Sequence, residues 1–188
     1  MNNNIYLSEI NKLKDKPWIN QVIFKKFIKR LQQKNLVKRD SFTDHICTFF
    51  LPIDVEKKLI YLCHHIKAQD WIPPGGHIDK GELPVETVKR EVFEELNYSV
   101  NLNQINVFDL SIKHIINPIH GCEYHYDIWH WIPIDKQDFN YTKKEYYDAR
   151  WITIPEANKL SKKNPTYLEI INKIPKIIFS PSPKGSRT

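Results

Sequence analysis

The stretch GGHIDKGELPVETVKREVFEELNY (residues 75–98) places two adjacent glycines ahead of charged residues that recur among apolar ones. A proline stands where the helical pattern opens, a position that suits the first turn, so we predict a helix over residues 84–96. At about 100° per residue, Glu91, Glu94 and Glu95 share one face of this helix beside an apolar stripe of valines and leucine. The helix should therefore pack on a core and hold three carboxylates at the edge of the packed face.

Three carboxylates so close together repel one another unless a cation lies among them. Oxygen ligands favour hard metals, Mg²⁺ above all, or Mn²⁺. Gly75 and Gly76 would let the backbone approach such a cation closely. Arg90 can hold a glutamate by a bidentate bond, and Glu82 can pair with Arg90. The spacing alone leaves an alternative equally open, namely an ordinary surface helix with i,i+4 charge pairs.

The same stretch resembles the Nudix box, a long and specific motif of the Nudix hydrolase superfamily. Asn97 stands where the motif has a glycine that ends the helix, and Asn is the next-best residue for the left-handed conformation expected there. HHIK (64–67) and WIPPGGHID (71–79) also resemble a bacterial group within this superfamily. The motif positions are filled here by Gly76, Glu82, Arg90, Glu91, Val92, Glu94, Glu95 and Asn97.

The resemblance implies an α/β fold, a Nudix-like α/β/α sandwich with a mixed central sheet. We assign residues 42–178 to this domain, 1–41 to a basic helical N-terminal extension and 179–188 to a disordered tail. Apolar periodicity predicts the remaining elements. These are a helix over 17–34, a hairpin of strands 45–53 and 57–66, an extended piece 71–76, strands 104–116 and 123–134 joined by a turn at 117–121, a strand 149–154, and helices 155–163 and 167–174.

The resemblance further implies a hydrolase that cleaves the diphosphate linkage of a nucleoside diphosphate joined to another moiety, with Mg²⁺ or Mn²⁺ as cofactor. Carried over position by position, it makes Glu91, Glu94, Glu95 and the Gly75 carbonyl the metal ligands. Glu91 is a ligand or the general base. Arg90, Glu82, Gly76 and Asn97 orient or shape the site, with Arg90 counted among the catalytic residues beside Glu91 and Glu94. A base outside the box is common in the family, and Glu145, Glu123 and Asp127 are the candidates.

Four further residues are candidate substrate contacts. His125 and Asp127 lie two apart on a predicted strand and therefore share a face. His77 follows the glycines directly, close to the predicted metal loop. Trp71 could stack on a nucleobase. The alternative for the histidines is a buried hydrogen-bonded ring or a surface ring, and large aromatics more often belong to the core.

Zinc chemistry and disulfides are not predicted. The three cysteines are far apart, are odd in number and include no C-x-x-C pair, which favours a reducing compartment. Strand alternation would divide one histidine set between two faces, namely His120, His125 and His130. No apolar run approaches the roughly 18–20 residues of a membrane span, so we expect a cytoplasmic protein without a membrane partner.

The net charge of +6 belongs to the N-terminal segment. Residues 1–40 hold ten Lys or Arg against three acids, a local charge of +7, so the rest of the chain is close to neutral. The basic helix predicted over 17–34 could pack its apolar stripe, in which we place Val22, on its own domain, or it could bind nucleic acid. The second interpretation would make RNA 5′ ends an alternative substrate. A homodimer is one assembly that the resemblance allows.

Two other functions stay open. The same fold hosts isopentenyl-diphosphate isomerase, which uses a cysteine and further metal-binding histidines, and Cys63 next to His64 is a faint match to it. A non-catalytic Nudix-fold module that binds nucleotide or RNA is the other. All charged positions of the box remain in this chain, which favours hydrolysis over both.

Overall fold

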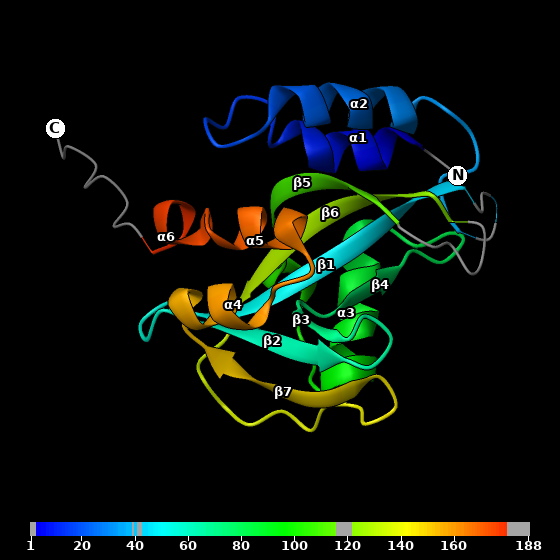
Figure 1. Cartoon of the computed structure of the whole chain (residues 1–188). Helices are drawn as coiled ribbons and strands as arrows, with labels where there is room; N and C mark the ends of the chain where they lie inside the picture. The colour runs from blue at the N-terminus through cyan, green and yellow to red at the C-terminus, as the bar shows by residue number, and fades with distance from the viewer. Residues whose placement is uncertain (1–2, 39, 41–42, 116–121, 180–188) are drawn as a thin grey trace, which may run out of the picture.

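A seven-stranded mixed sheet forms the centre of the molecule (Figure 1). The computed structural model describes residues 3–38, 40, 43–115 and 122–179. The predicted turn at 117–121 and tail at 180–188 lie outside these residues. The strands are β1 (Asp44–Asp54), β2 (Leu59–His65), β3 (Asp70–Ile72), β4 (Gly75–His77), β5 (Asn106–His114), β6 (Tyr124–Pro133) and β7 (Tyr146–Ile152).

The strand order is β3-β2-β1-β6-β5, with β4 paired to β1 and β7 paired to β2. Strands β1 and β6 run parallel, while the other pairings within the described residues are antiparallel, so the predicted mixed sheet is confirmed. The predicted hairpin of β1 and β2 and the predicted pairing of β5 with β6 are also confirmed. Strand β7 begins three residues before the predicted strand at 149–154.

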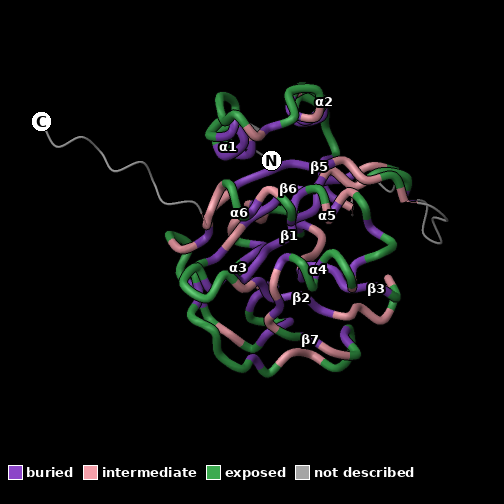
Figure 2. Tube along the Cα trace, turned by 60° about the vertical axis from the view of Figure 1, so that its left-hand side comes forward, coloured by how far each residue is buried: buried purple, intermediate pink, exposed green. Residues whose placement is uncertain are grey.

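Helices cover both faces of the sheet, as the predicted sandwich requires. They are α1 (Asn3–Asn11), α2 (Gln21–Leu31), α3 (Pro84–Leu96), α4 (Ile154–Leu160), α5 (Pro165–Ile171) and α6 (Ile174–Ile177), with a short 3₁₀ turn at Leu102–Gln104. Alternate residues of β1 point to opposite faces. Phe49 and Leu51 pack with α4, α5 and α6, whereas Ile46 packs with α1 and α2, and Phe50 packs with α3. Figure 2 shows the buried strands enclosed between these helices.

The N-terminal extension packs on the sheet, which confirms that its apolar stripe serves its own domain. Phe27 and Leu31 of α2 are fully buried with Ile128 of β6. The helix predicted over 17–34 is shorter in the structure, because the Asn20 side chain accepts hydrogen bonds from the first turn and starts α2 at Gln21.

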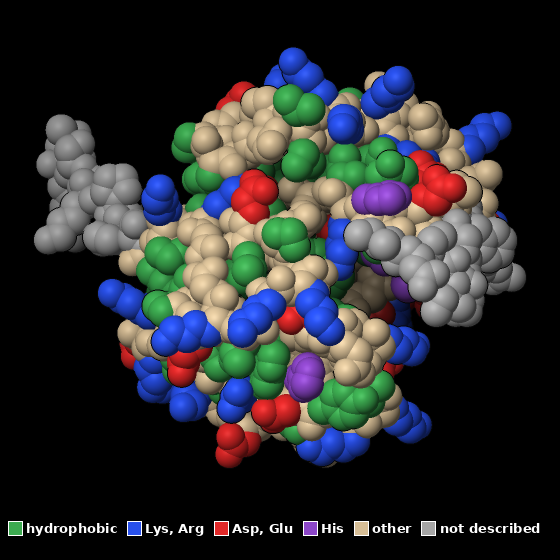
Figure 3. Space-filling view, viewed as in Figure 1, with side chains coloured by type: hydrophobic (Ala, Val, Ile, Leu, Met, Phe, Trp, Pro, Cys, Tyr) green, Lys and Arg blue, Asp and Glu red, His purple; other side chains and the backbone are tan. Residues whose placement is uncertain are grey.

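The outer face of the N-terminal segment is polar and basic. Val22 was placed in the apolar stripe, but it is 65% exposed, so that assignment was wrong. Figure 3 shows Lys and Arg side chains (blue) projecting along the upper edge, where α1 and α2 lie in Figure 1. None of the helices in the described part of the chain has the length and apolar character that crossing a bilayer requires.

Helix α3 spans Pro84–Leu96, as predicted. Pro84 begins it and Asn97 ends it in the left-handed conformation, with φ 50° and ψ 41°. The Asn97 backbone N–H donates to the Phe93 carbonyl oxygen at 2.9 Å. Asn97 therefore takes the backbone conformation expected at the position where the motif has glycine.

Substitutions at Asn97 should separate this backbone requirement from any role of its side chain. We expect Asn97→Gly to be as stable as the wild type or slightly more stable, because glycine enters the left-handed region freely. Asn97→Ala should be about 1–2 kcal/mol less stable than Asn97→Gly, the cost of a Cβ in that conformation. Urea denaturation measures both differences. Equal stability of the Ala and Gly variants would contradict the argument.

Candidate active site

Arg90 is the centre of the box. Its Nε donates to Glu82 Oε1 at 2.9 Å and its Nη2 donates to Glu82 Oε2 at 3.0 Å, a bidentate pair. Nη1 donates to Glu91 Oε1 at 2.7 Å and to Glu94 Oε2 at 3.3 Å. Nη2 also reaches the backbone carbonyl of His77 at 3.2 Å. One guanidinium thus holds three carboxylates and the end of β4 in fixed relation.

Glu82 lies just before α3 and is fully engaged. Besides Arg90, its Oε2 accepts the Thr87 hydroxyl at 2.7 Å and the Asp79 backbone N–H at 3.3 Å. The hydrogen bonds from Arg90 are the main reason that the pKa of Glu82 is lowered. Glu82 therefore stays ionised and serves to orient Arg90.

Glu91 presses against the backbone of β4 at Gly76. A Cβ at Gly76 would lie 2.1 Å from Glu91 Oε1, so any side chain there would displace the carboxylate. Glu91 is buried, and burial raises its pKa against the opposing effect of Arg90. Glu91 can therefore keep this position only because residue 76 is a glycine and has no side chain.

Glu95 is the most buried carboxylate of the box. Its Oε2 accepts the Gly75 backbone N–H at 3.1 Å, and Tyr146 of β7 bonds to the same side chain. Burial raises the pKa of Glu95, and the nearby charge of Glu91 raises it further. Two neighbouring acids with raised pKa values indicate a cation site, because a bound cation would favour the ionised form of each acid.

Glu94 and Glu145 form the open side of the site. The Glu94 side chain is 55% exposed and touches Arg90. Glu145 is exposed in the turn just before β7, and its charge contributes to the raised pKa values of Glu91 and Glu95. The structure thus brings Glu145 near the box, whereas exposed Glu123 makes its described contacts with Thr43 and Ile115.

The four predicted substrate contacts lie in different settings. Asp127 is fully buried, and burial raises its pKa to about 7. Trp71 is nearly buried, with its ring stacked on His64 and the Arg150 guanidinium 4.7 Å from its centre. His77 and His125 are half-buried, with ring centroids 5.4 Å apart.

The rings of His77 and His125 are neutral at pH 7. The pKa of His77 is lowered to about 3 by burial first and by the charge of Lys38 next. The pKa of His125 is also lowered to about 3, by burial first and by His45 next. The prediction that these residues contact substrate stays a prediction.

Cys63 and His64 do not share a face of β2. Cys63 is fully buried beneath α3, in the cluster that includes Val88 and Val92. His64 stacks instead on Trp71. The adjacent pair that faintly matched the isomerase is therefore divided by strand alternation.

The donor set of the box fits a hard divalent cation. Glu95 accepts from the Gly75 N–H, Glu91 lies against Gly76, and Glu94 is held on the same helix by Arg90. Carboxylate oxygens of this kind suit Mg²⁺ or Mn²⁺. The cradle at Gly76, where a Cβ would overlap Glu91, leaves backbone and carboxylate in close approach. These residues would hold the ion.

Several functional side chains were not anticipated from the sequence. Thr87 bonds to Glu82, and Tyr146 bonds to Glu95. The contact of Thr87 could have been inferred from its position five residues after Glu82. The contact of Tyr146 could not, because it depends on the approach of β7 to α3. His45 and Cys47 also lie beside His77 and His125. Their i,i+2 spacing in a predicted strand was the available signal.

Comparison with known proteins identifies the family. Residues 44–174 match the NUDIX domain family, so the chain belongs to the Nudix hydrolases. No sequence among curated proteins matches the chain.

Solved structures share the fold. The E. coli dihydroneopterin triphosphate pyrophosphohydrolase is 17% identical, with a TM-score of 0.60 over 71% of this chain and 94% of its own. The MutT protein from Methanosarcina mazei Go1 is 18% identical, with a TM-score of 0.53 over 69% and 90%. The NUDIX domain of Shewanella oneidensis NrtR, complexed with ADP ribose, is 13% identical, with a TM-score of 0.56 over 70% and 86%.

The charge of Glu95 should destabilise the metal-free protein at neutral pH. A carboxyl whose pKa is raised on folding stabilises the protein at low pH, and that contribution is lost as pH rises through the folded pKa. We expect metal-free Glu95→Gln to melt a few degrees above wild type at pH 8, with about 2–4 °C for each kcal/mol in a domain of this size. The difference should shrink toward pH 4.

Mg²⁺ should reverse this order. It should raise the Tm of the wild type at pH 8 and raise that of Glu95→Gln much less, since a bound ion stabilises the fold in proportion to its affinity. Calorimetry with and without Mg²⁺ measures both effects. Glu56→Gln, at an exposed acid in the turn after β1, serves as the control. A Glu95→Gln variant that gains as much from Mg²⁺ as the wild type would contradict the assignment.

Proposed function

We propose that the chain is a Mg²⁺-dependent hydrolase that cleaves the diphosphate linkage of a nucleoside diphosphate joined to another moiety. The supporting observation is the Arg90 centre, which holds Glu82, Glu91 and Glu94 within 3.3 Å of one guanidinium. A surface helix with simple charge pairs would not bury two of its carboxylates beside a glycine cradle. Here Glu91 and Glu95 are both buried at the Gly75–His77 strand.

Hydrolysis requires a water molecule to attack one phosphorus atom of the diphosphate. The oxygen of water forms the new P–O bond, the bridging P–O bond breaks, and the leaving phosphate takes the bond electrons. When bound, the cation supplies charge neutralisation on the diphosphate oxygens and lowers the pKa of water. The chain must supply a group that takes the proton from water.

Glu145 is the proposed proton acceptor outside the box. It is exposed, so it can reach a water molecule, and it lies near enough to Glu91 and Glu95 to affect their pKa values. Arg90 has the positioning role, because it fixes the rotamers of Glu91 and Glu94 and anchors the carbonyl of His77.

The proposal does not specify the group joined to the nucleoside diphosphate. A groove beside the basic helix α2 is relevant to the identity of this group. This groove lies between α2 and the β5–β6 strands, and basic side chains line it together with tyrosine rings. Such a combination suits single-stranded nucleic acid. RNA therefore stays an alternative substrate. The residues concerned are Lys26, Lys29, Tyr124 and Tyr126, while Arg30 also lines the groove but is buried and paired with Asp44 at 3.0 Å.

A substrate panel tests the proposal. We expect Mg²⁺-dependent release of phosphate or nucleotide from one class among nucleoside triphosphates, ADP-ribose, a UDP-sugar, NADH, diadenosine polyphosphate and triphosphorylated RNA. EDTA should abolish the release. For RNA, binding should also fall steeply with salt, because phosphate contacts release counterions. If folded protein that binds Mg²⁺ releases neither phosphate nor nucleotide from any of these substrates, the result would favour a non-catalytic binding module.

Glu94→Gln tests the site assignment. Glu94 is exposed, so the variant should fold, yet turnover should fall by more than the roughly 10- to 100-fold that loss of an outer-shell partner costs at a metal site. Glu86→Gln is the matched control, because it makes the same change on the same helix and its amide oxygen can still accept from Leu83 N–H. Near-wild-type turnover of Glu94→Gln would refute the assignment.

A further inference from the structure

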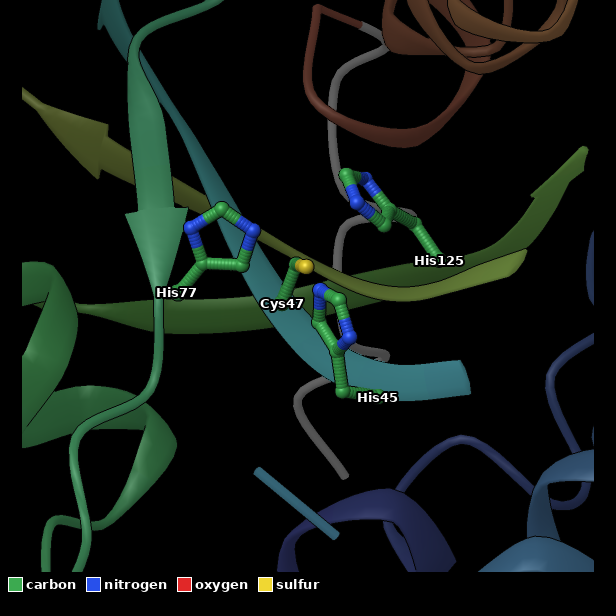
Figure 4. A group of neighbouring side chains, drawn as sticks. All are labelled: His45, Cys47, His77 and His125. Atoms are coloured by element: carbon green, nitrogen blue, oxygen red, sulfur yellow. The ribbon is translucent and has the colours of Figure 1, made fainter. Parts of the chain in front are cut away.

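Four metal-binding side chains meet at a place distinct from the box. The ligand atoms of His45, Cys47, His77 and His125 all lie within 4.8 Å of one another. Figure 4 shows the four side chains extending from three neighbouring strands into one space, with the Cys47 sulfur among the imidazole rings. The ring centroid of His45 lies 4.9 Å from those of both His77 and His125.

The sheet register creates this cluster. His45 and Cys47 are two apart on β1 and therefore point to the same face. Cys47 is directly opposite His77 across the antiparallel β1–β4 pair. His45 is directly opposite His125 across the parallel β1–β6 pair. Residues opposite one another on neighbouring strands share a face, so backbone pairing alone brings the four side chains together.

The donor chemistry selects the kind of metal. Three imidazoles and one thiol are the ligands of zinc and of other borderline or soft transition metals, whereas Mg²⁺ requires oxygen. Tetrahedral zinc with its usual bond lengths would place donor atoms roughly 3.3–3.6 Å apart. The observed limit of 4.8 Å is close enough for small side-chain rotations to reach that spacing. Four protein ligands fill a tetrahedral site, which is typical of structural zinc.

The surroundings add a second observation. Asp127 is opposite Cys47 across the β1–β6 pair, so it lies on the same face beside the cluster. It is fully buried, and its Oδ2 accepts from the Ser111 hydroxyl at 3.0 Å. Its Oδ1 has no hydrogen-bond partner among the described residues. A buried carboxylate with an unsatisfied oxygen beside imidazoles is a common outer-shell feature of metal sites, where it orients a ligating ring.

The cluster and the box lie on opposite sides of β4. Thr48 is opposite Gly76, and Cys47 is opposite His77, so the two β4 residues point to opposite faces. Gly76 faces Glu91 on the α3 side. The His77 side chain faces away from α3, although its carbonyl oxygen accepts from Arg90 at 3.2 Å. A metal in the cluster would therefore be separate from the cation of the box.

We propose that His45, Cys47, His77 and His125 bind one zinc ion that ties β4 to β1 and β6 and thereby braces the strand on which the box depends. His77 and His125 then act as zinc ligands in place of the direct substrate contact predicted for them. The site differs from the excluded set of His120, His125 and His130, because its members come from three strands in register.

The test uses the full chain and two probes, zinc content and Co²⁺ alone. We expect the protein as purified, or after zinc loading and desalting, to retain about one zinc ion per chain. After removal of zinc with a chelator, Co²⁺ should give visible d–d bands of tetrahedral type and a near-ultraviolet thiolate-to-cobalt band. Neither readout depends on activity or on Mg²⁺.

Variants then assign the ligands. Cys47→Ser should lose the thiolate band, and His125→Gln, at a half-buried position, should weaken cobalt binding at least about 10-fold while the chain stays folded by circular dichroism. Cys63→Ser is the matched control at another buried thiol, beneath α3. It should keep the band. Glu94→Gln should also keep the full zinc content, which separates this site from the box.

The proposal fails if folded wild-type protein binds neither zinc nor cobalt tightly, or if Glu94→Gln removes the metal. It also fails if the thiolate band disappears in Cys122→Ser and survives in Cys47→Ser. The Cys122 sulfur lies 3.8 Å from His45 Nε2, so that variant is the strictest comparison.

Discussion

The guanidinium of Arg90 is the interaction on which the box depends. It sits among carboxylates that would otherwise repel one another, and it also reaches the backbone of β4 through the His77 carbonyl. A lysine could not replace it, because a single ammonium cannot offer the bidentate bond to Glu82 while holding Glu91 and Glu94 as well. Helix α3 is thus fixed to the sheet by charge as well as by its valines.

The carboxylates around Arg90 are not equally stabilised in their ionised forms. Arg90 satisfies Glu82, whose pKa is lowered, but it does not offset the burial of Glu91 and Glu95, whose pKa values are raised. A site optimised for stability alone would not keep two buried acids in this state. Raised pKa values at neighbouring buried acids are typical of a functional site.

The sequence predicted the local parts of the molecule well. Helix α3 has the predicted bounds, and Asn97 ends it in the left-handed conformation, because capping, proline position and apolar period all act within a few residues. Helix α2 was predicted too long, since a single side chain, Asn20, sets its start. The mixed sheet was implied by family resemblance rather than by the strand patterns.

The parts that sequence reasoning missed depend on strand register. His45 and Cys47 gain their neighbours through pairings with β4 and β6 that no local pattern specifies. The alternation rule separates His125 and His130 of β6, but metal ligands on a sheet can come from several strands at once. Tyr146 reaches Glu95 for the same reason, because the approach of β7 to α3 is a tertiary contact.

The parallel pairing of β1 with β6 also bears on how the molecule folds. The contacts of Arg90 span between 1 and 13 positions along the chain, so they close short loops. The contact between His45 and Cys122, at the edge of the His and Cys cluster, spans 77 positions. Closing longer loops costs more entropy, and proteins rich in distant contacts fold more slowly. The two candidate metal sites therefore differ in how far apart their parts lie in the chain: Arg90 gathers its partners over short loops, whereas the cluster exists only where β1 pairs with both β4 and β6.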